Sequence, residues 1–213
     1  MAMQIKLVRH GESAANIGVA SPQHLGDHNI ELTERGHAQA EAAGRELGRE
    51  CLEQALIYAS PYRRTRETTA GLLRGAGIPE TEWPEVYEDP RLREVEHGYY
   101  DYEAQTWDRS IHGWFYYRFQ GGESPADCFD RVSTFLETLM RQVSRKPNSN
   151  VVVVSHGLTI RCFVMRFLHL SVEEFEALAN PGNAAIVTLG MRDEIEDPLH
   201  VSGRWAVTGL RHR

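Results

Sequence analysis

The sequence has few cysteines and no long apolar run. Its three cysteines, Cys51, Cys128 and Cys162, form no C-x-x-C pair, which argues against a disulfide framework and against a thiolate metal site. No stretch approaches the roughly 20 apolar residues of a membrane-spanning helix. The first residues are typical of a strand and not of a secretory signal. We therefore expect a soluble, cytoplasmic protein.

Basic residues are also in deficit, which restricts the partners of the chain. It has 30 acidic residues against 23 Lys and Arg, a formal net charge of −7. Such a charge does not attract nucleic acid or anionic membranes over long range. An anionic ligand would have to be held locally, and arginine suits this task because its planar donors match phosphate oxygens. We expect neither nucleic acid nor membrane as a partner.

Metal-binding patterns are absent as well, although the chain has ten histidines. His24 and His28 are four residues apart, but they lie in a stretch that contains glycine and is typical of a loop. The sequence has no H-E-x-x-H motif and no closely paired cysteines and histidines. We expect no metal and no other cofactor.

What the sequence does contain is an alternation of apolar runs and helical patterns. The apolar runs predict buried strands at residues 4–8, 55–59, 151–154 and 184–189. Ser60 and Ser124, each followed by proline, are predicted as N-caps of helices. The alternation predicts one three-layer α/β domain over residues 1–213, with a mostly parallel central sheet and helices on both faces.

Aromatic residues gather in one part of this domain. Nearly half of them fall between Tyr99 and Phe119, including Tyr100 and Tyr102. This predicts a small aromatic-rich lid, inserted at about residues 97–122. Arg118 lies between aromatics, where it could reach a second anionic group of a substrate or stack on tyrosines.

Two of the predicted strands end in the same way. LVRHG places Arg9 and His10 after the first strand, and VVVVSHG places His156 after a later one. Ligands of open α/β sheets bind beyond the carboxyl ends of the strands. If the strands are neighbours, both imidazoles face one cleft, and with Arg9 they favour an anion. Gly11 and Gly157 would let backbone and ligand approach closely.

Two further stretches add charged side chains. SPYRRTRETTAGL carries Arg63, Arg64 and Arg66 at the start of a helix, where free N–H groups also attract anions. We expect one of these arginines to point into the cleft. In PRLREVEHG, Glu94 and Glu96 would lie on the same side of an extended segment, so their spacing does not choose between them.

The blocks LVRHGESAAN, LTERGHAQA, SPYRRTRETTAGL, LREVEHG, GGES and VVVVSHG, in this order, resemble the histidine phosphatase superfamily, also called phosphoglycerate-mutase-like. The resemblance covers almost the whole chain. The run from YEDPRLREVEHG through GWFYYRFQGGES resembles a phosphatase-like branch described from fungi and plants.

This resemblance implies roles for the matching residues. His10 would be the nucleophile and Arg9 would bind the phosphate. Glu94, in the L-x-E block, would be the proton donor, and His156 would be the second catalytic histidine, in the phosphate pocket with Gly157.

Other positions match less closely. Arg64 falls on a phosphate-binding arginine of the family, although Tyr62 and Thr65 stand where the family has Leu and Ala. Asn16 matches an asparagine that often touches the phosphate. Glu96 and His97 depart from the usual acidic or polar residue followed by an aromatic, so we expect them to affect substrate specificity.

The function implied is that of a metal-independent phosphomonoesterase that acts on a small phosphorylated substrate through phosphohistidine on His10. Arg9, Arg64 and a protonated His156 would stabilise the phosphoryl charge. His10 would be neutral, with one ring nitrogen donating to a backbone carbonyl. Glu94 would act as general acid and then as general base. The protein would be a monomer or a homodimer.

Two alternatives remain open. A cofactor-dependent phosphoglycerate mutase of this family would carry paired basic residues in a longer insertion after the acid, where this chain has only Arg109 and Arg118. A non-catalytic phosphate-binding module would keep the pocket without turnover. Nothing in the sequence indicates such a loss.

Overall fold

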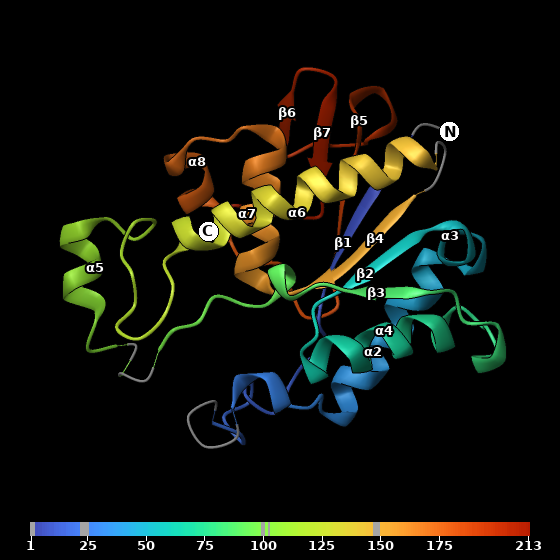
Figure 1. The fold of residues 1–213 in the computed structure, drawn as a ribbon, viewed down its shortest axis with the longest axis horizontal. Helices are drawn as coiled ribbons and strands as arrows, with labels where there is room; N and C mark the ends of the chain where they lie inside the picture. Colours follow the sequence, from blue (N-terminus) through green and yellow to red (C-terminus); the bar gives the residue numbers. More distant parts are fainter. Residues whose placement is uncertain (1–2, 22–25, 99–100, 102, 147–149) are drawn as a thin grey trace.

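Seven strands form a single sheet in the computed structural model of the chain, which describes residues 3–21, 26–98, 101, 103–146 and 150–213. Their order across the sheet is β3-β2-β4-β1-β5-β7-β6 (Figure 1). The strands are β1 (Ile5–Arg9), β2 (Leu56–Ala59), β3 (Val86–Glu88), β4 (Val151–Ser155), β5 (Ile186–Met191), β6 (His200–Ser202) and β7 (Trp205–Thr208).

The sheet is mixed, so the α/β class is confirmed but the mostly parallel sheet was only partly right. β1 pairs with β4, and β2 with both β3 and β4, in parallel. β5 pairs with β1 and β7, and β6 with β7, in antiparallel fashion. β5 runs the other way because the chain enters it beside the end of β1, where the amide of Arg9 donates to the carbonyl of Ala185.

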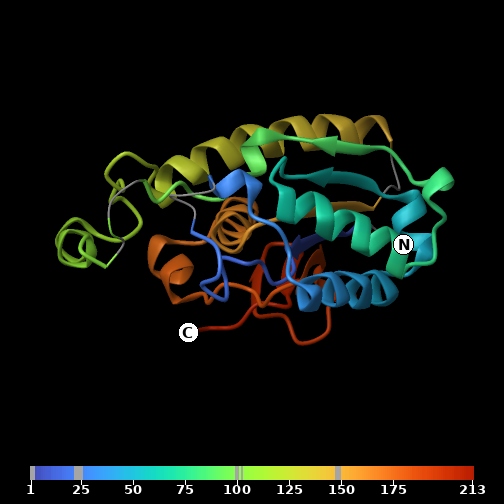
Figure 2. The same cartoon turned by 90° about the horizontal axis from the view of Figure 1, so that it is seen from below.

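Helices cover both faces of the sheet, as predicted. Figure 2 shows α6 on one side of β2 and β3, and α2 and α4 on the other. The helices are α2 (Glu34–Leu47), α3 (Arg49–Gln54), α4 (Arg63–Gly75), α5 (Thr106–His112), α6 (Pro125–Arg145), α7 (Gly157–Leu168) and α8 (Val172–Ala177). Short 3-10 turns are η1 (Asp27–Asn29), η2 (Glu80–Glu82), η3 (Pro90–Leu92) and η4 (Arg192–Glu194).

The core is divided by the sheet. Because successive side chains of a strand point to opposite faces, Leu7 packs in the cluster with Phe135 of α6, whereas Val8 packs in the cluster with Leu72 of α4. The central strands β1 and β4 are thus apolar on both sides. This double burial explains their continuous Val and Leu runs and fixes the positions at which their carboxyl ends leave the sheet.

The two Ser-Pro pairs behave differently. Ser124 caps α6 as predicted, and it forms a capping box with Asp127. The N-cap predicted at Ser60 is wrong, because α4 begins at Arg63 with Tyr62 as its N-cap residue. The hydroxyl of Ser60 is committed elsewhere, as described below.

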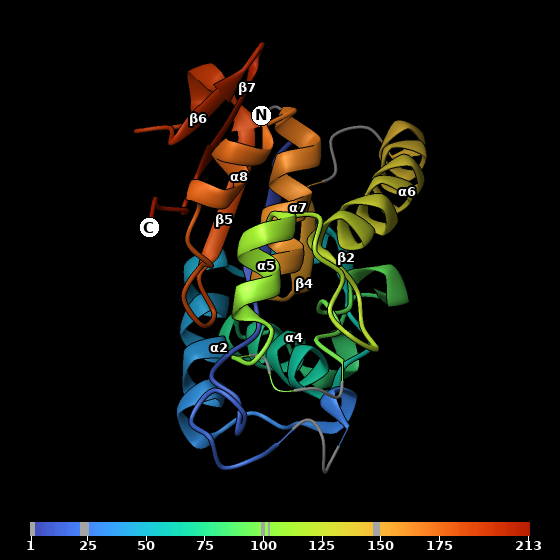
Figure 3. The same ribbon diagram turned by 90° about the vertical axis from the view of Figure 1, so that its left-hand side faces the viewer.

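The aromatic segment projects from one end of the domain. In Figure 1 its helix, α5, lies at the left edge, and Figure 3 views the molecule from that side. Phe115, Tyr117 and Phe119 are buried in the cluster that also contains the buried faces of α6 and α7. Trp107, by contrast, is 72% exposed. Tyr99, Tyr100 and Tyr102, which belong to the predicted lid, lie outside the described residues.

Candidate active site

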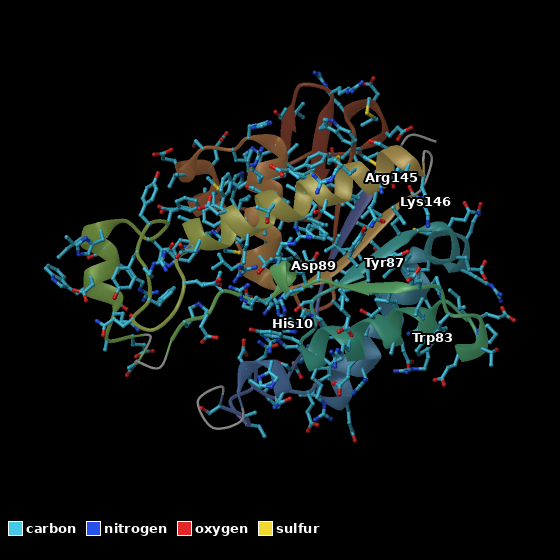
Figure 4. All side chains as sticks on the ribbon, viewed as in Figure 1. His10, Trp83, Tyr87, Asp89, Arg145 and Lys146 are labelled. Carbon is cyan, nitrogen blue, oxygen red and sulfur yellow. The ribbon has the colours of Figure 1, made fainter. Side chains whose placement is uncertain are left out.

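The carboxyl ends of β1 and β4 bring two histidines together. Because these strands pair in parallel and in register, His10 and His156 leave the sheet side by side. Their ring centroids are 5.2 Å apart, and the rings are inclined by 59°. The two imidazoles are therefore in contact, as expected, but His10 lines the cavity described below and His156 does not. Figure 4 places His10 in the middle of the molecule, away from Arg145 and Lys146 at the far end of the sheet.

The two rings use opposite nitrogens in their bonds to the protein. Nδ1 of His10 lies 2.7 Å from the carbonyl oxygen of Gly11 and donates to it, which leaves Nε2 without a proton on a neutral ring. Nε2 of His156 lies 2.9 Å from Oγ of Ser60. Nδ1 of His156 is buried and has no hydrogen-bond partner among the described residues. Buried polar atoms are nearly always paired, so this nitrogen indicates a ligand position.

Both histidines are buried, and their surroundings favour the uncharged rings. Burial is the main cause that lowers the pKa of each well below the usual 6.5, and the charge of Arg64 adds to it. This direction favours the neutral His10 that is expected from the sequence. For His156 it disfavours the protonated ring, because a charge there would be buried beside the guanidinium groups of Arg64 and Arg9, and the protonated form stays a prediction.

The two guanidinium groups are themselves held in place. Nη1 of Arg9 donates to the carbonyl of Pro181 at 2.7 Å, whereas its Nε is buried without a partner among the described residues. Arg64 binds the carboxylate of Asp27 through Nη1 at 3.0 Å and Nη2 at 3.1 Å. Its Nη1 also donates to the Asp27 carbonyl at 2.6 Å. The charge and plane of Arg64 are therefore fixed before any ligand binds.

A cavity of about 670 Å³ opens at this point. Most of the predicted site residues line it, namely Arg9, His10, Asn16, Arg64, Glu94, Glu96 and His97. His156 lies behind His10 and is 0% exposed. Arg118 is outside the lining, with a side chain that is 67% exposed and bound to Asp127.

The glycines that follow the histidines allow protein segments to approach each other. A Cβ on Gly11 would lie 2.4 Å from the carbonyl oxygen of Gly36 in α2, and a Cβ on Gly157 would lie 3.0 Å from Cγ of Asn180. Gly11 thus lets the strand end pack directly on α2. The close approach of a ligand to Gly157 stays a prediction.

The carboxylate of Glu94 lies beside the first residues of α7. Its Oε2 accepts from the backbone N–H of Leu158 at 3.5 Å, and its Oε1 accepts from that of Val95 at 3.0 Å. The hydroxyl of Thr159 lies 3.2 Å from Oε1. Glu96, by contrast, is exposed at the mouth of the cavity. The structure thus separates two carboxylates that sequence spacing left equivalent.

Asn16 is oriented by its own carbonyl oxygen. Oδ1 accepts from the backbone N–H of Ser13 at 3.0 Å and from Nδ2 of Asn183 at 3.0 Å. Because Oδ1 is engaged, the amide nitrogen of Asn16 is the end available to a ligand in the cavity.

Sequence reasoning missed three supporting residues. Ser60 carries the hydroxyl that contacts His156, and Asp27 holds Arg64. Glu123 binds the guanidinium groups of Arg93 and Arg131, which secures the segment that carries Glu94. Of these three, only Glu123 lies in a block that the resemblance singled out, GGES, and that block does not indicate which arginines it binds.

Neither a metal site nor a membrane span is found in the described part of the chain. No group of three or more His, Cys, Asp or Glu side chains there is arranged to hold a metal ion. No helix there is both long enough and apolar enough to cross a membrane. His24 lies outside the described residues.

Comparison with known proteins agrees with this geometry. The model of the histidine phosphatase superfamily (branch 1) matches residues 5–200. The chain belongs to this superfamily. As a histidine phosphatase, it is a hydrolase of the phosphatase type.

Two curated relatives and one solved structure are similar to this histidine phosphatase over most of its length. The phosphoglycerate mutase-like protein AT74H of Arabidopsis thaliana is 39% identical, over 93% of this chain and 78% of its own length. The broad-range acid phosphatase DET1 of Saccharomyces cerevisiae is 28% identical, over 90% and 86%. These plant and yeast relatives agree with the resemblance stated above. A mycobacterial glucosyl-3-phosphoglycerate phosphatase in complex with VO3 has a TM-score of 0.73 and 28% identity, over 97% of both chains.

Proposed function

We propose that this histidine phosphatase hydrolyses small phosphate monoesters through a phosphohistidine on His10, without a metal ion. One observation carries the proposal. His10 is a buried, neutral imidazole whose Nδ1 is committed to the Gly11 carbonyl, so that Nε2 is available as a nucleophile. It lies in a cavity with two arginines and next to a second histidine that has an unpaired ring nitrogen.

In this proposal, the phosphate is bound by groups from four segments. Arg9 and Arg64 supply the positive charge, and Asn16 offers its amide nitrogen. His156 can serve as a neutral ring if Nε2 accepts from the Ser60 hydroxyl and Nδ1–H donates to a phosphate oxygen. Gly157, the first residue of α7, adds a helix N-terminus. Bound phosphate would thereby pair donors that are otherwise buried and unpaired.

The reaction then proceeds in two displacements. Nε2 of His10 attacks phosphorus while the bond to the ester oxygen breaks, and Glu94 gives its proton to that oxygen. Glu94 next removes a proton from water, which attacks the phosphohistidine and releases inorganic phosphate. The contacts of Glu94 with Leu158 and Thr159 fix its position for both steps.

The role of Glu94 is tested by varying the leaving group. Glu94→Gln is expected to slow alkyl phosphates by about 10²–10⁴-fold. It should slow nitrophenyl phosphate far less, because nitrophenolate leaves without a proton. Glu80→Gln, in the exposed η2 turn, is the matched control. Equal losses on both esters would remove Glu94 as the general acid.

Two other functions are separated by simple assays. A non-catalytic phosphate-binding module would bind phosphate but hydrolyse no ester in a broad panel, whereas we expect hydrolysis that is lost in His10→Ala. A cofactor-dependent phosphoglycerate mutase would outrun hydrolysis in a coupled assay with bisphosphoglycerate primer. We expect hydrolysis to win, because Arg109 is buried against Thr106 and Arg118 is bound to Asp127.

We further propose that the aromatic segment, about residues 97–122, acts as a lid. His97 and Gly98 at its start line the cavity, and the ring of Phe119 packs edge-on against His97 with centroids 4.7 Å apart. Location in the cytoplasm and the monomeric or homodimeric state remain predictions.

A further inference from the structure

We propose that the mouth of the cavity selects phosphate monoesters whose alcohol part is neutral or cationic and rich in hydrogen-bond donors, and that it rejects esters with a second anionic group. The selecting element is the acidic rim, which we define as the carboxylates of Asp27 and Glu96. This inference rests on the proposed phosphatase function and narrows its substrate class.

Among the described residues that line the cavity, no lysine and no further arginine is left for a second anion. Apart from histidines, the described lining has two guanidinium groups, Arg9 and Arg64, and three carboxylates, Asp27, Glu94 and Glu96. Both guanidinium groups line the cavity beside His10, and in the proposed mechanism they bind the reacting phosphate. Arg64 is moreover bound to both carboxylate oxygens of Asp27.

Arginines near the cavity are also committed. Arg93 is bound to Glu123, and Arg118 is bound to Asp127. Neither lines the cavity. A carboxylate or second phosphate on the substrate would therefore meet the rim without an arginine partner in the described part of the chain.

Asp27 and Glu96 both act on the hydroxyl of Tyr62. Its ring packs against His156, with centroids 5.1 Å apart. The pKa of Tyr62 is raised to about 12, first by burial and then by the charges of Asp27 and Glu96, although Arg64 and Arg93 oppose them. Asp27 and Glu96 thus lie close enough to Tyr62, beside His156, to contribute to the rise of its pKa.

The rim has the chemistry of a donor-binding surface. Carboxylates accept hydrogen bonds from hydroxyl and ammonium groups and repel anions. A single exposed carboxylate near a bound anion changes its affinity by about tenfold or less, since solvent screens the charge. Because Asp27 is bound to Arg64, the exposed Glu96 carries most of the effect of the rim, and one such carboxylate is sufficient for a measurable preference.

The test uses esters that differ in one group. Glycerol 3-phosphate and 3-phosphoglycerate share a three-carbon skeleton, but the first ends in a hydroxymethyl group and the second in a carboxylate. We expect the wild type to favour glycerol 3-phosphate by about tenfold or more in kcat/KM. Glu96→Gln should reduce this ratio by about 3- to 10-fold, because it removes the charge at nearly constant shape.

Phosphoethanolamine and a distant variant separate charge from general damage. Glu96→Gln should lower kcat/KM for the cationic phosphoethanolamine while it raises that for 3-phosphoglycerate. A folding defect would lower both. Glu80→Gln makes the same chemical change three residues from Trp83, which Figure 4 places well away from His10, and it should alter neither.

The outcomes distinguish the two levels of the proposal. Equal or better use of 3-phosphoglycerate by the wild type, or an unchanged ratio in Glu96→Gln, would overturn the acidic rim alone, provided that hydrolysis is lost in His10→Ala. If no ester is hydrolysed, or if hydrolysis survives His10→Ala, the phosphatase proposal fails and the rim proposal falls with it.

Discussion

His10 and His156 arise from the same local pattern and reach opposite arrangements. Each follows a buried strand of the parallel half of the sheet, and each precedes a glycine. His10 donates through Nδ1 to its own neighbour, Gly11, which leaves Nε2 available. His156 engages Nε2 with the distant Ser60 and leaves Nδ1 unpaired.

In the proposed mechanism, the role of each histidine is set by the ring nitrogen that the protein occupies. An imidazole with a free, unprotonated nitrogen can attack phosphorus, whereas one with a free N–H can only stabilise an oxygen. Because the rings are in contact and share nearly the same burial, the bonding partner is what distinguishes them. Variants that alter these partners should separate the two roles.

The largest expected effect separates the histidines directly. His10→Ala removes the proposed nucleophile, so kcat should fall by about 10⁵-fold or more. His156→Ala removes one phosphate donor, so the loss should be about 10²–10³-fold. Both are measured with nitrophenyl phosphate. Losses of equal size in the two variants would contradict the assignment of different roles.

A smaller effect contrasts the two Ser-Pro pairs. Ser60→Ala frees Nε2 of His156, and we expect kcat/KM to fall by about tenfold with little change in thermal stability. Ser124→Ala removes the cap of α6 and should cost about 1 kcal/mol of stability, with kcat/KM nearly unchanged. Steady-state kinetics and thermal unfolding are measured on both variants. If Ser60→Ala lost only stability, its proposed link to His156 would be wrong.

The smallest effect is on the pH dependence of stability. The pKa of both histidines is lowered by folding, so below about pH 6.5 the unfolded chain binds protons that the folded chain does not. The free energy of unfolding should therefore fall toward acid, by about 1.4 kcal/mol per pH unit for each histidine.

His156→Asn removes one of these contributions. Urea unfolding of the wild type and of this variant between about pH 8 and pH 5 gives the two slopes. The slope of the variant should be shallower below about pH 6.5. Identical slopes would mean that His156 is not held in the neutral form.

Much of the site could be predicted because it lies where the sequence pattern is strongest. The doubly buried strands β1 and β4 have continuous apolar runs, and both end in His-Gly, so the strands themselves and the end of the sheet that holds the site were predictable. The pattern made the meeting of His10 with His156 conditional on the two strands being neighbours, which the structure shows. The direction of β5 was not, because an apolar run has no direction. Strands β6 and β7 are short, and Val201 in β6 is 45% exposed, so their pattern is weak.

The wrong N-cap at Ser60 and the missed role of Asp27 have different causes. An N-cap is strengthened by an acidic residue three positions on. Three residues after Ser124 stands Asp127, whereas three residues after Ser60 stands Arg63. The sequence therefore already indicated that Ser60 was the weaker N-cap. Asp27 gave none, because its role comes from a contact with Arg64, which lies far along the chain.

The central claim is that phosphate passes through Nε2 of His10. Rapid acid-free quenching of the enzyme during turnover of a radiolabelled phosphate ester, followed by peptide mapping, tests it most directly. We expect a label that is stable in alkali and lost in acid, carried by the peptide that contains His10 and absent in His10→Ala. A label on another residue, or a label that persists in His10→Ala, would contradict the account.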